Sequence, residues 1–181
     1  MGLKLVSIQS EKDIPEEFRN QPLGRLLEYH NLKRPYEIYA NAELLIGMCM
    51  DNRKHLQIPD NFAYIIRTGG ANMRYSEFRV SYAIAVGGVK QIALIGHNQC
   101  GMVNLMSRRD LFIDGLVQGA GWERERALEH FNNYVGIHEI DNEVEFVMSE
   151  SKRLNEKYPK IAVAPFIYRI EDNLLYAVKS E

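Results

Sequence analysis

The sequence predicts an α/β fold with a mainly parallel central sheet, flanked by helices, and an antiparallel hairpin at its C-terminal edge. Apolar runs of strand length alternate with amphipathic runs of helical length, which is typical of a parallel sheet with helical crossovers. The apolar runs 161–170 and 174–178 flank a Glu-Asp-Asn turn, which predicts the hairpin. With 181 residues and 46% hydrophobic content, the chain fits one domain spanning residues 1–181.

Residues 1–34 are expected to form a leading helical arm. A short alternating apolar piece opens it, and Asp13 is placed to cap a helix whose first turn contains Pro15 and two glutamates. A second segment ends before Pro35 and carries leucines at helical spacing, namely Leu23, Leu26, Leu27 and Leu32. The apolar side of such a helix must pack on the chain's own core or on a partner subunit, and the sequence leaves both open.

Three apolar runs in the middle of the chain are expected to be buried strands, and they cover residues 44–48, 62–66 and 91–95. A helix is expected from about Ser76 to Gly87, so that it joins the last two strands in a right-handed βαβ unit. Residues 101–106 are expected to begin another helix. Charged amphipathic helices are expected over 122–134 and 139–158, with breaks at Gly136 and Pro159.

Composition and charge argue against several classes of function. A net charge of -2 gives no electrostatic footprint for nucleic acid. The apolar runs fall short of the about 20 residues that span a bilayer, and the N-terminus lacks the order of a signal peptide, so we expect a cytoplasmic protein without membrane contact. The chain has only two cysteines, and in a reducing compartment metal binding or catalysis is a better use for them than a disulfide.

Both cysteines lie in short motifs where an apolar run ends. Cys49 begins the motif Cys-x-Asp-x-Arg, which includes Asp51 and Arg53, and His97 and Cys100 form a His-x-x-Cys motif. Because the carboxyl ends of neighbouring parallel strands face one crevice, the two motifs are expected to meet there. Two cysteines and one histidine are a three-ligand zinc set, which leaves the fourth tetrahedral position open.

A glycine pair follows the second of the buried runs. Gly69 and Gly70 permit a tight turn and close backbone approach, so that their N–H groups can face a small anion or a reacting molecule. Together with Ala71 they are our candidates for a substrate pocket. The alternative is that this segment is only a turn.

Each of these residues also has an ordinary structural explanation. A single cysteine after a strand is usually a small buried apolar residue, and Asp51 with Arg53 can be a solvated ion pair. The combination of two cysteines and a histidine at matching strand ends favours a metal site. The remaining histidines lie in segments without ligand spacing and are His30, His55, His130 and His138.

Taken together, Cys49-x-Asp51-x-Arg53, the Arg-x-x-Gly loop at 67–70 and His97-x-x-Cys100 resemble the β-class carbonic anhydrases, particularly their small prokaryotic members. The resemblance implies that zinc binds to Cys49, His97 and Cys100, with Asp51 and Arg53 as a dyad beside it. It implies reversible hydration of carbon dioxide to bicarbonate by attack of zinc-bound hydroxide. Segment 13–32 is then expected to pack on a partner subunit in a dimer or larger assembly.

Two other functions remain open on the same residues. Relatives of this fold hydrolyse carbonyl sulfide or carbon disulfide, which are also small, linear and electrophilic at carbon. The other hypothesis is a zinc protein without enzymatic activity. The resemblance also leaves open whether the Asp51 carboxylate itself occupies the fourth position on zinc in a resting state.

Overall fold

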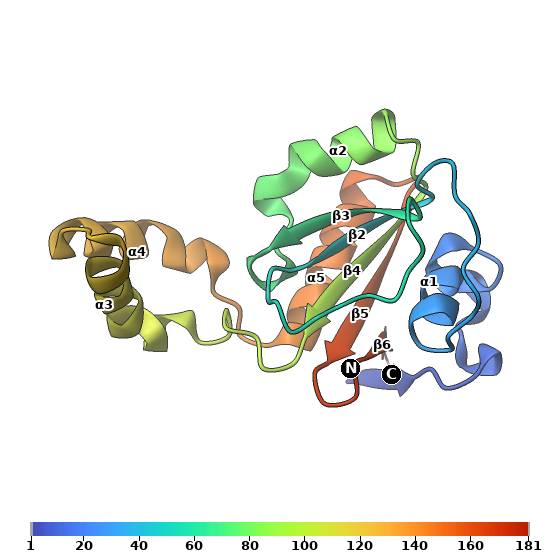
Figure 1. Cartoon of the computed structure of the whole chain (residues 1–181), viewed down its shortest axis with the longest axis horizontal. Coiled ribbons are helices and arrows are strands. Elements are labelled where there is room, and N and C mark those ends of the chain that lie inside the picture. The colour runs from blue at the N-terminus through green and yellow to red at the C-terminus, as the bar shows by residue number, and fades with distance from the viewer. Residues whose placement is uncertain (1, 181) are drawn as a thin grey trace.

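The computed structural model describes residues 2–180, and these form one six-stranded sheet with helices on both faces (Figure 1). The strand order is β1-β6-β5-β4-β2-β3. The strands are β1 (Leu3–Ser7), β2 (Leu44–Cys49), β3 (Ala63–Thr68), β4 (Gln91–His97), β5 (Ala162–Arg169) and β6 (Leu174–Ser180).

The sheet is parallel from β3 to β5 and antiparallel at the side formed by β6 and β1. Strand β2 pairs in parallel with both β3 and β4, and β4 pairs in parallel with β5. Strand β6 then returns antiparallel to β5, and β1 pairs antiparallel with β6. The predicted fold class, including the C-terminal hairpin, is confirmed.

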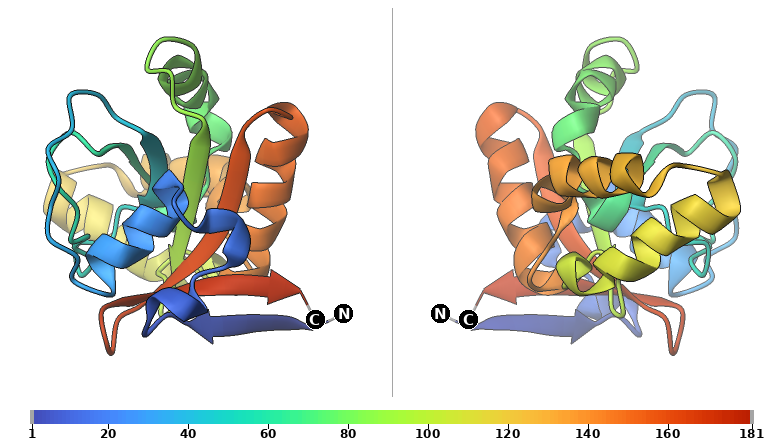
Figure 2. Two further views of the ribbon diagram at one scale, coloured as in Figure 1. Left: turned by 90° about the vertical axis from the view of Figure 1, so that its right-hand side faces the viewer. Right: turned by 90° about the vertical axis from the view of Figure 1, so that its left-hand side faces the viewer.

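The described part of the chain has five α-helices, and three of them cover the two faces of the sheet (Figure 2). Helix α1 lies on one face, whereas α2 and α5 lie on the other, and α3 and α4 form a hairpin that projects from the body (Figure 1). The helices are α1 (Pro22–His30), α2 (Glu77–Ala85), α3 (Arg109–Ala120), α4 (Arg124–His138) and α5 (Glu143–Lys157).

Side chains of β2 alternate between the two cores, as the period of a strand requires. Leu44 and Ile46 pack on the face of α1, whereas Leu45 packs on the face of α2 and α5. Because both faces are covered, β2 and β4 are buried along their whole length. This burial explains why both strands appear in the sequence as continuous apolar runs.

The expected helical arm at residues 1–34 is wrong in its first half. Residues Leu3–Ser7 are an edge strand, and two 3-10 turns follow at Glu11–Asp13 and Glu16–Phe18. Asp13 does not cap a following α-helix, because its carboxylate accepts the N–H groups of Gln9 and Ser10 at 3.1 and 2.8 Å. The carboxylate thus closes the turn that precedes it.

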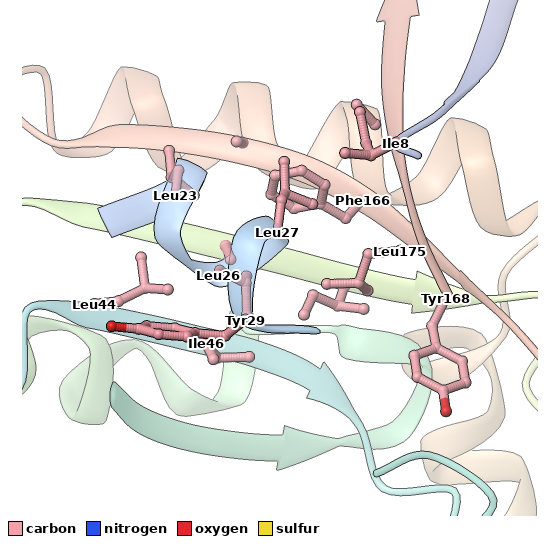
Figure 3. Packing of buried hydrophobic residues seen from close by; sticks show 14 of the residues in the cluster. Ile8, Leu23, Leu26, Leu27, Tyr29, Leu44, Ile46, Phe166, Tyr168 and Leu175 are labelled. Carbon is pink, nitrogen blue, oxygen red and sulfur yellow. The ribbon is translucent and has the colours of Figure 1, made fainter. Parts of the chain in front are cut away.

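Helix α1 packs on the sheet of its own chain, as Figure 3 shows. Leu23, Leu26 and Leu27 are fully buried in the core formed with β2, β4 and β5. The side chain of Gln91 on β4 accepts the N–H of Leu23 at 3.0 Å and so fixes the start of the helix. The expectation that this segment packs on a partner subunit therefore loses its basis, since its apolar side is already covered.

The predicted breaks between the later helices also need correction. Helix α4 continues through Gly136, and the chain leaves the helix at Glu139, whose backbone is extended. Helix α5 begins after Asn142, whose side chain accepts the N–H groups of Val144 and Glu145 at 2.9 and 3.0 Å. This cap makes Asn142 the physical start of the helix.

The segment 101–106 does not begin a helix in the expected way. Asn104 adopts a left-handed conformation, with φ of 50°, and only then does a 3-10 turn at Leu105–Arg108 lead into α3. Helix α3 itself was not predicted. Among residues 2–180, no helix is both long enough and apolar enough to cross a bilayer.

Candidate metal centre

The two motifs meet because their strands are neighbours. Cys49 is the last residue of β2 and His97 is the last residue of β4, and these two strands pair in parallel with Met48 opposite Ile95. Cys100 follows three residues later, on the loop after β4. The ligand atoms of Cys49, His97 and Cys100 all lie within 4.8 Å of one another, and all three side chains are buried.

The spacing of the two sulfur atoms suits a tetrahedral metal. The Sγ atoms of Cys49 and Cys100 are 3.9 Å apart, and both residues are free thiols. Two thiolates on one zinc ion, each with a bond of about 2.3 Å, place their sulfurs about 3.8 Å apart in tetrahedral geometry. The pair therefore needs almost no movement to hold zinc.

The imidazole of His97 is oriented for the same purpose. Its Nδ1 lies 2.8 Å from the carbonyl oxygen of Asn98, so this nitrogen carries the proton and donates it. Its Nε2 is buried and has no hydrogen-bond partner among the described residues. A buried polar atom without a partner is costly, and a metal ion at this point would satisfy it. The donor set thus fits zinc.

The two thiols affect each other's ionisation. The hydrogen bond from Cys100, aided by His97 and by the backbone at Asp51, lowers the pKa of the Cys49 thiol. The same hydrogen bond and burial raise the pKa of Cys100. The metal-free pair therefore shares one proton, which must leave when a metal ion takes both thiolates.

Asp51 and Arg53 form a close ion pair beside these ligands. Nε of Arg53 donates to Oδ1 of Asp51 at 3.0 Å, and Nη2 donates to Oδ2 at 2.7 Å. These contacts, with the backbone N–H of Arg53, hold the pKa of the Asp51 carboxyl far below its usual range. Oδ2 also lies 3.9 Å from Nε2 of His97, so the carboxylate faces the metal ligands while it is paired with the arginine.

Arg67 on β3 holds the first motif from the neighbouring strand. Its guanidinium donates to the carbonyl oxygens of Cys49, Asp51 and Lys54, at 3.3, 3.4 and 3.2 Å. In the sequence this arginine is only the first residue of a glycine loop. Its role in holding the motif was missed, because the contact depends on β2 and β3 being adjacent.

The second motif is held by side chains from the C-terminal half. The side chain of Asn98 accepts the N–H of Ile170 at 2.9 Å and donates to Glu171 at 2.6 Å. Glu143, the first residue of α5, accepts the N–H of Cys100 at 3.2 Å. No local pattern in the sequence indicates Glu143, since it lies more than 40 residues from the cysteine that it contacts.

The glycine loop lies beside the metal ligands, but its three candidates differ in position. Gly70 and Ala71 are buried, and Gly70 has a left-handed φ of 62° that glycine adopts without strain. Gly69 faces an apolar pocket of about 360 Å³ that Met50 and Met102 also line. The rest of its wall comes from the turn Leu105–Arg108 and from the projecting helical hairpin and consists of Leu105, Phe112, His130, Phe131, Tyr134, Val135 and His138.

No family model matches this chain, and no curated protein sequence matches it. Solved structures do match its fold. A carbonic anhydrase from Glaciozyma antarctica is 20% identical and superposes with a TM-score of 0.61, over 79% of this chain and 85% of that one. A β-carbonic anhydrase from Trichomonas vaginalis is 17% identical, with a TM-score of 0.62 over 80% and 87% of the two chains.

A carbon disulfide hydrolase in its apo form also matches, at 22% identity and a TM-score of 0.53, over 89% of this chain and 90% of that one. At these identities the likeness concerns the fold. The six-stranded sheet with its antiparallel C-terminal side, and the helices on both faces, agree with these structures. The chain therefore has the fold of the β-carbonic anhydrases.

Proposed function

We propose that this protein is a zinc enzyme that hydrates carbon dioxide reversibly to bicarbonate. The observation that carries the proposal is the meeting of Cys49, His97 and Cys100 within 4.8 Å, with the Asp51 carboxylate beside them. Zinc bound there would supply an acidic water as the nucleophile. Within residues 2–180 this cluster offers three ligands, which leaves one of the four positions of zinc for that water.

Asp51 and Arg53, beside the ligands, have different roles in this proposal. Asp51 is ionised and accepts hydrogen bonds, so it can orient the proton of a water and direct a lone pair toward the substrate carbon. Arg53 holds the carboxylate through three side-chain hydrogen bonds and itself donates to the carbonyl oxygen of Gln99, at 3.0 Å. The dyad is thus set in place before a substrate arrives.

The pocket next to the centre suits an uncharged substrate. Its walls near the ligands are the side chains of Met50 and Met102 and the backbone of Gly69, and none of these offers a charge. Carbon dioxide is small and uncharged and can enter such a pocket without losing strong hydration. In this proposal Gly69 lines the substrate site, and Gly70 and Ala71 are the buried residues that follow it in the loop.

The apolar pocket equally favours a second candidate function, hydrolysis of carbon disulfide or carbonyl sulfide. A carbon disulfide hydrolase shares the fold, and its substrate is linear and uncharged as well. The third possibility, a zinc protein without activity, is less well supported, because a site that only stabilises a fold is normally closed by four protein ligands.

The test is metal analysis of the purified protein together with two assays. We expect about one zinc per chain and rapid hydration of carbon dioxide in a stopped-flow indicator assay. Sulfide release from carbonyl sulfide and carbon disulfide is measured in parallel, and a faster reaction there would assign the second function. A zinc-loaded protein that is inactive on all three substrates would contradict both enzymatic proposals.

Self-association belongs to the same proposal but needs a surface other than α1. Strand β3 is an edge of the sheet, and Tyr64 and Ile65 on it are exposed, together with Phe78 and Tyr82 of the adjacent α2. An apolar sheet edge of this kind supports pairing with a second copy. Light scattering at micromolar concentration measures whether the chain forms a dimer.

A cytoplasmic location belongs to the proposal as well. The two free thiols are consistent with the reducing compartment expected for a cytoplasmic protein.

A further inference from the structure

Lys54 is a charged residue that the proposed chemistry does not use, and it is fully buried. Its side chain has 0% exposure, and its Nζ has no hydrogen-bond partner among the described residues. Lysine is almost never fully buried without a partner, because removing an ammonium group from water is costly. Such a position needs a compensating interaction.

The groups that surround Lys54 are those of the metal centre. Nζ lies 3.7 Å from Oδ1 of Asp51, on the carboxylate that Arg53 also holds. Burial lowers the pKa of Lys54, whereas the negative charge of Asp51 acts to keep it protonated, and Arg67 acts against it. The ammonium group therefore lies buried beside the carboxylate of the first motif.

Counting charges shows what this ammonium adds. Two thiolates neutralise a divalent metal ion, His97 is neutral, and Arg53 neutralises Asp51. Arg67 and Glu143, which bind backbone groups of the two tips, have opposite charges and cancel as well, so a centre with these groups has no net charge and little attraction for anions. Lys54 leaves the loaded centre with one positive charge in excess, inside a buried site where a charge acts more strongly than in water.

Building on the proposed zinc site, we infer that Lys54 is a positioning residue that holds the Asp51 carboxylate together with Arg53 and gives the loaded centre affinity for small monovalent anions. Both candidate reactions release such an anion, bicarbonate in one case and hydrosulfide in the other. The residue would thus contribute the positive charge that a centre with two thiolates otherwise lacks.

The experiment uses the full chain loaded with cobalt, whose visible absorption reports on its ligands, and thiocyanate as the anion. Lys54→Met removes the charge at similar length, and Lys54→Arg keeps it. Lys90→Met is the matched control, because Lys90 is exposed and precedes β4 at the end of the sheet opposite to His97. We expect Lys54→Met to bind thiocyanate at least about tenfold more weakly, as loss of a nearby charge requires.

Lys54→Arg should recover most of the thiocyanate affinity, and Lys90→Met should behave as wild type. A cobalt-loaded Lys54→Met that binds thiocyanate like wild type would overturn the inference and leave the metal site intact. If Lys54→Met does not fold or load cobalt, Lys54→Gln replaces it, and failure of both overturns the inference in favour of a structural role. A wild type that takes up neither zinc nor cobalt would instead contradict the proposed function itself.

Discussion

The two strand tips that build the proposed metal centre differ in how they are held. The first tip, residues 49–54, is fixed mainly by arginines that donate to its carbonyl oxygens and to its carboxylate. The second tip, residues 97–101, is fixed by Asn98 and Glu143, which bind backbone N–H groups of or near the tip. The first tip is therefore held by charged donors that bind its oxygen atoms, and the second tip is held by side chains that accept backbone N–H groups.

Exposure follows the same division. The side chain of Arg53 is 43% exposed and that of Asp51 is 18% exposed, whereas the side chain of His97 is fully buried. The buried atoms are those suited to hold a metal ion, and the partly exposed atoms are those suited to handle a proton. Metal binding and turnover should therefore be separable by mutation.

The largest effect is expected for Cys49→Ser. A serine hydroxyl stays protonated and cannot replace a thiolate, so zinc content should fall from about one per chain to nearly none after dialysis against a chelator. The loss of affinity should exceed the about 10 to 100-fold that removal of a surrounding partner causes. Mass spectrometry of the metal checks this, with Met50→Leu as the control. Full zinc retention in Cys49→Ser would contradict the ligand assignment.

The second largest effect is a loss of stability in acid through His30, which contacts the loop that follows the first tip. His30 is buried, its Nδ1 accepts the N–H of Gln57 at 3.0 Å, and burial lowers its pKa from 6.5 to about 4. The unfolded chain therefore binds a proton first as pH falls. The free energy of unfolding should decrease by about 3 kcal/mol between pH 6.5 and 4, and it should not change through His30 above that window.

Urea unfolding at several pH values measures this decrease. The His30→Gln variant should be less stable near neutral pH and should show a flatter pH dependence than wild type. His55→Gln is the matched control, because His55 is exposed and lies two residues before Gln57, which His30 contacts. Equal slopes for wild type and His30→Gln would assign the acid sensitivity to other groups.

Asp51→Ala should reduce turnover without reducing metal binding. The three ligands remain, so zinc content should stay near one per chain. The hydration rate should fall about 10 to 100-fold, the usual effect of removing a group that orients a metal-bound ligand. Zinc content, melting temperature and rate are measured side by side with Asp60→Ala, an exposed aspartate of the same loop. Normal zinc with an unchanged rate would refute the role of the dyad.

The smallest effect is expected at the second tip. Asn98→Ala removes the hydrogen bonds to Ile170 and Glu171, which are only partly buried or exposed, and one hydrogen bond typically contributes about 1 kcal/mol to stability. Melting temperature should fall by a few degrees, with less effect on turnover than Asp51→Ala. Asn52→Ala, an exposed residue of the first tip, is the control. A greater loss of turnover in Asn98→Ala than in Asp51→Ala would reverse the comparison.

The buried strands, the two polar tips and the C-terminal hairpin could be predicted from the sequence, whereas the edge strand β1 and helix α3 could not. Buried strands such as β2 and β4 are continuous apolar runs, and the hairpin of β5 and β6 follows from its turn, because both patterns depend on neighbouring residues. The placement of Cys49, His97 and Cys100 at strand ends could be predicted for the same reason. Whether these residues share one centre depended on β2 and β4 being adjacent.

Which distant side chains complete the centre depends on long-range contacts in the folded chain. Arg67, Glu143 and Lys54 look in sequence like solvated charges, yet two of them bind the backbone of the tips and the third is buried beside Asp51. Likewise, the apolar side of α1 is covered by the chain's own sheet. The spacing of apolar residues predicts that one face of a helix is buried. It does not predict which element covers that face, because this depends on long-range contacts that no short pattern contains.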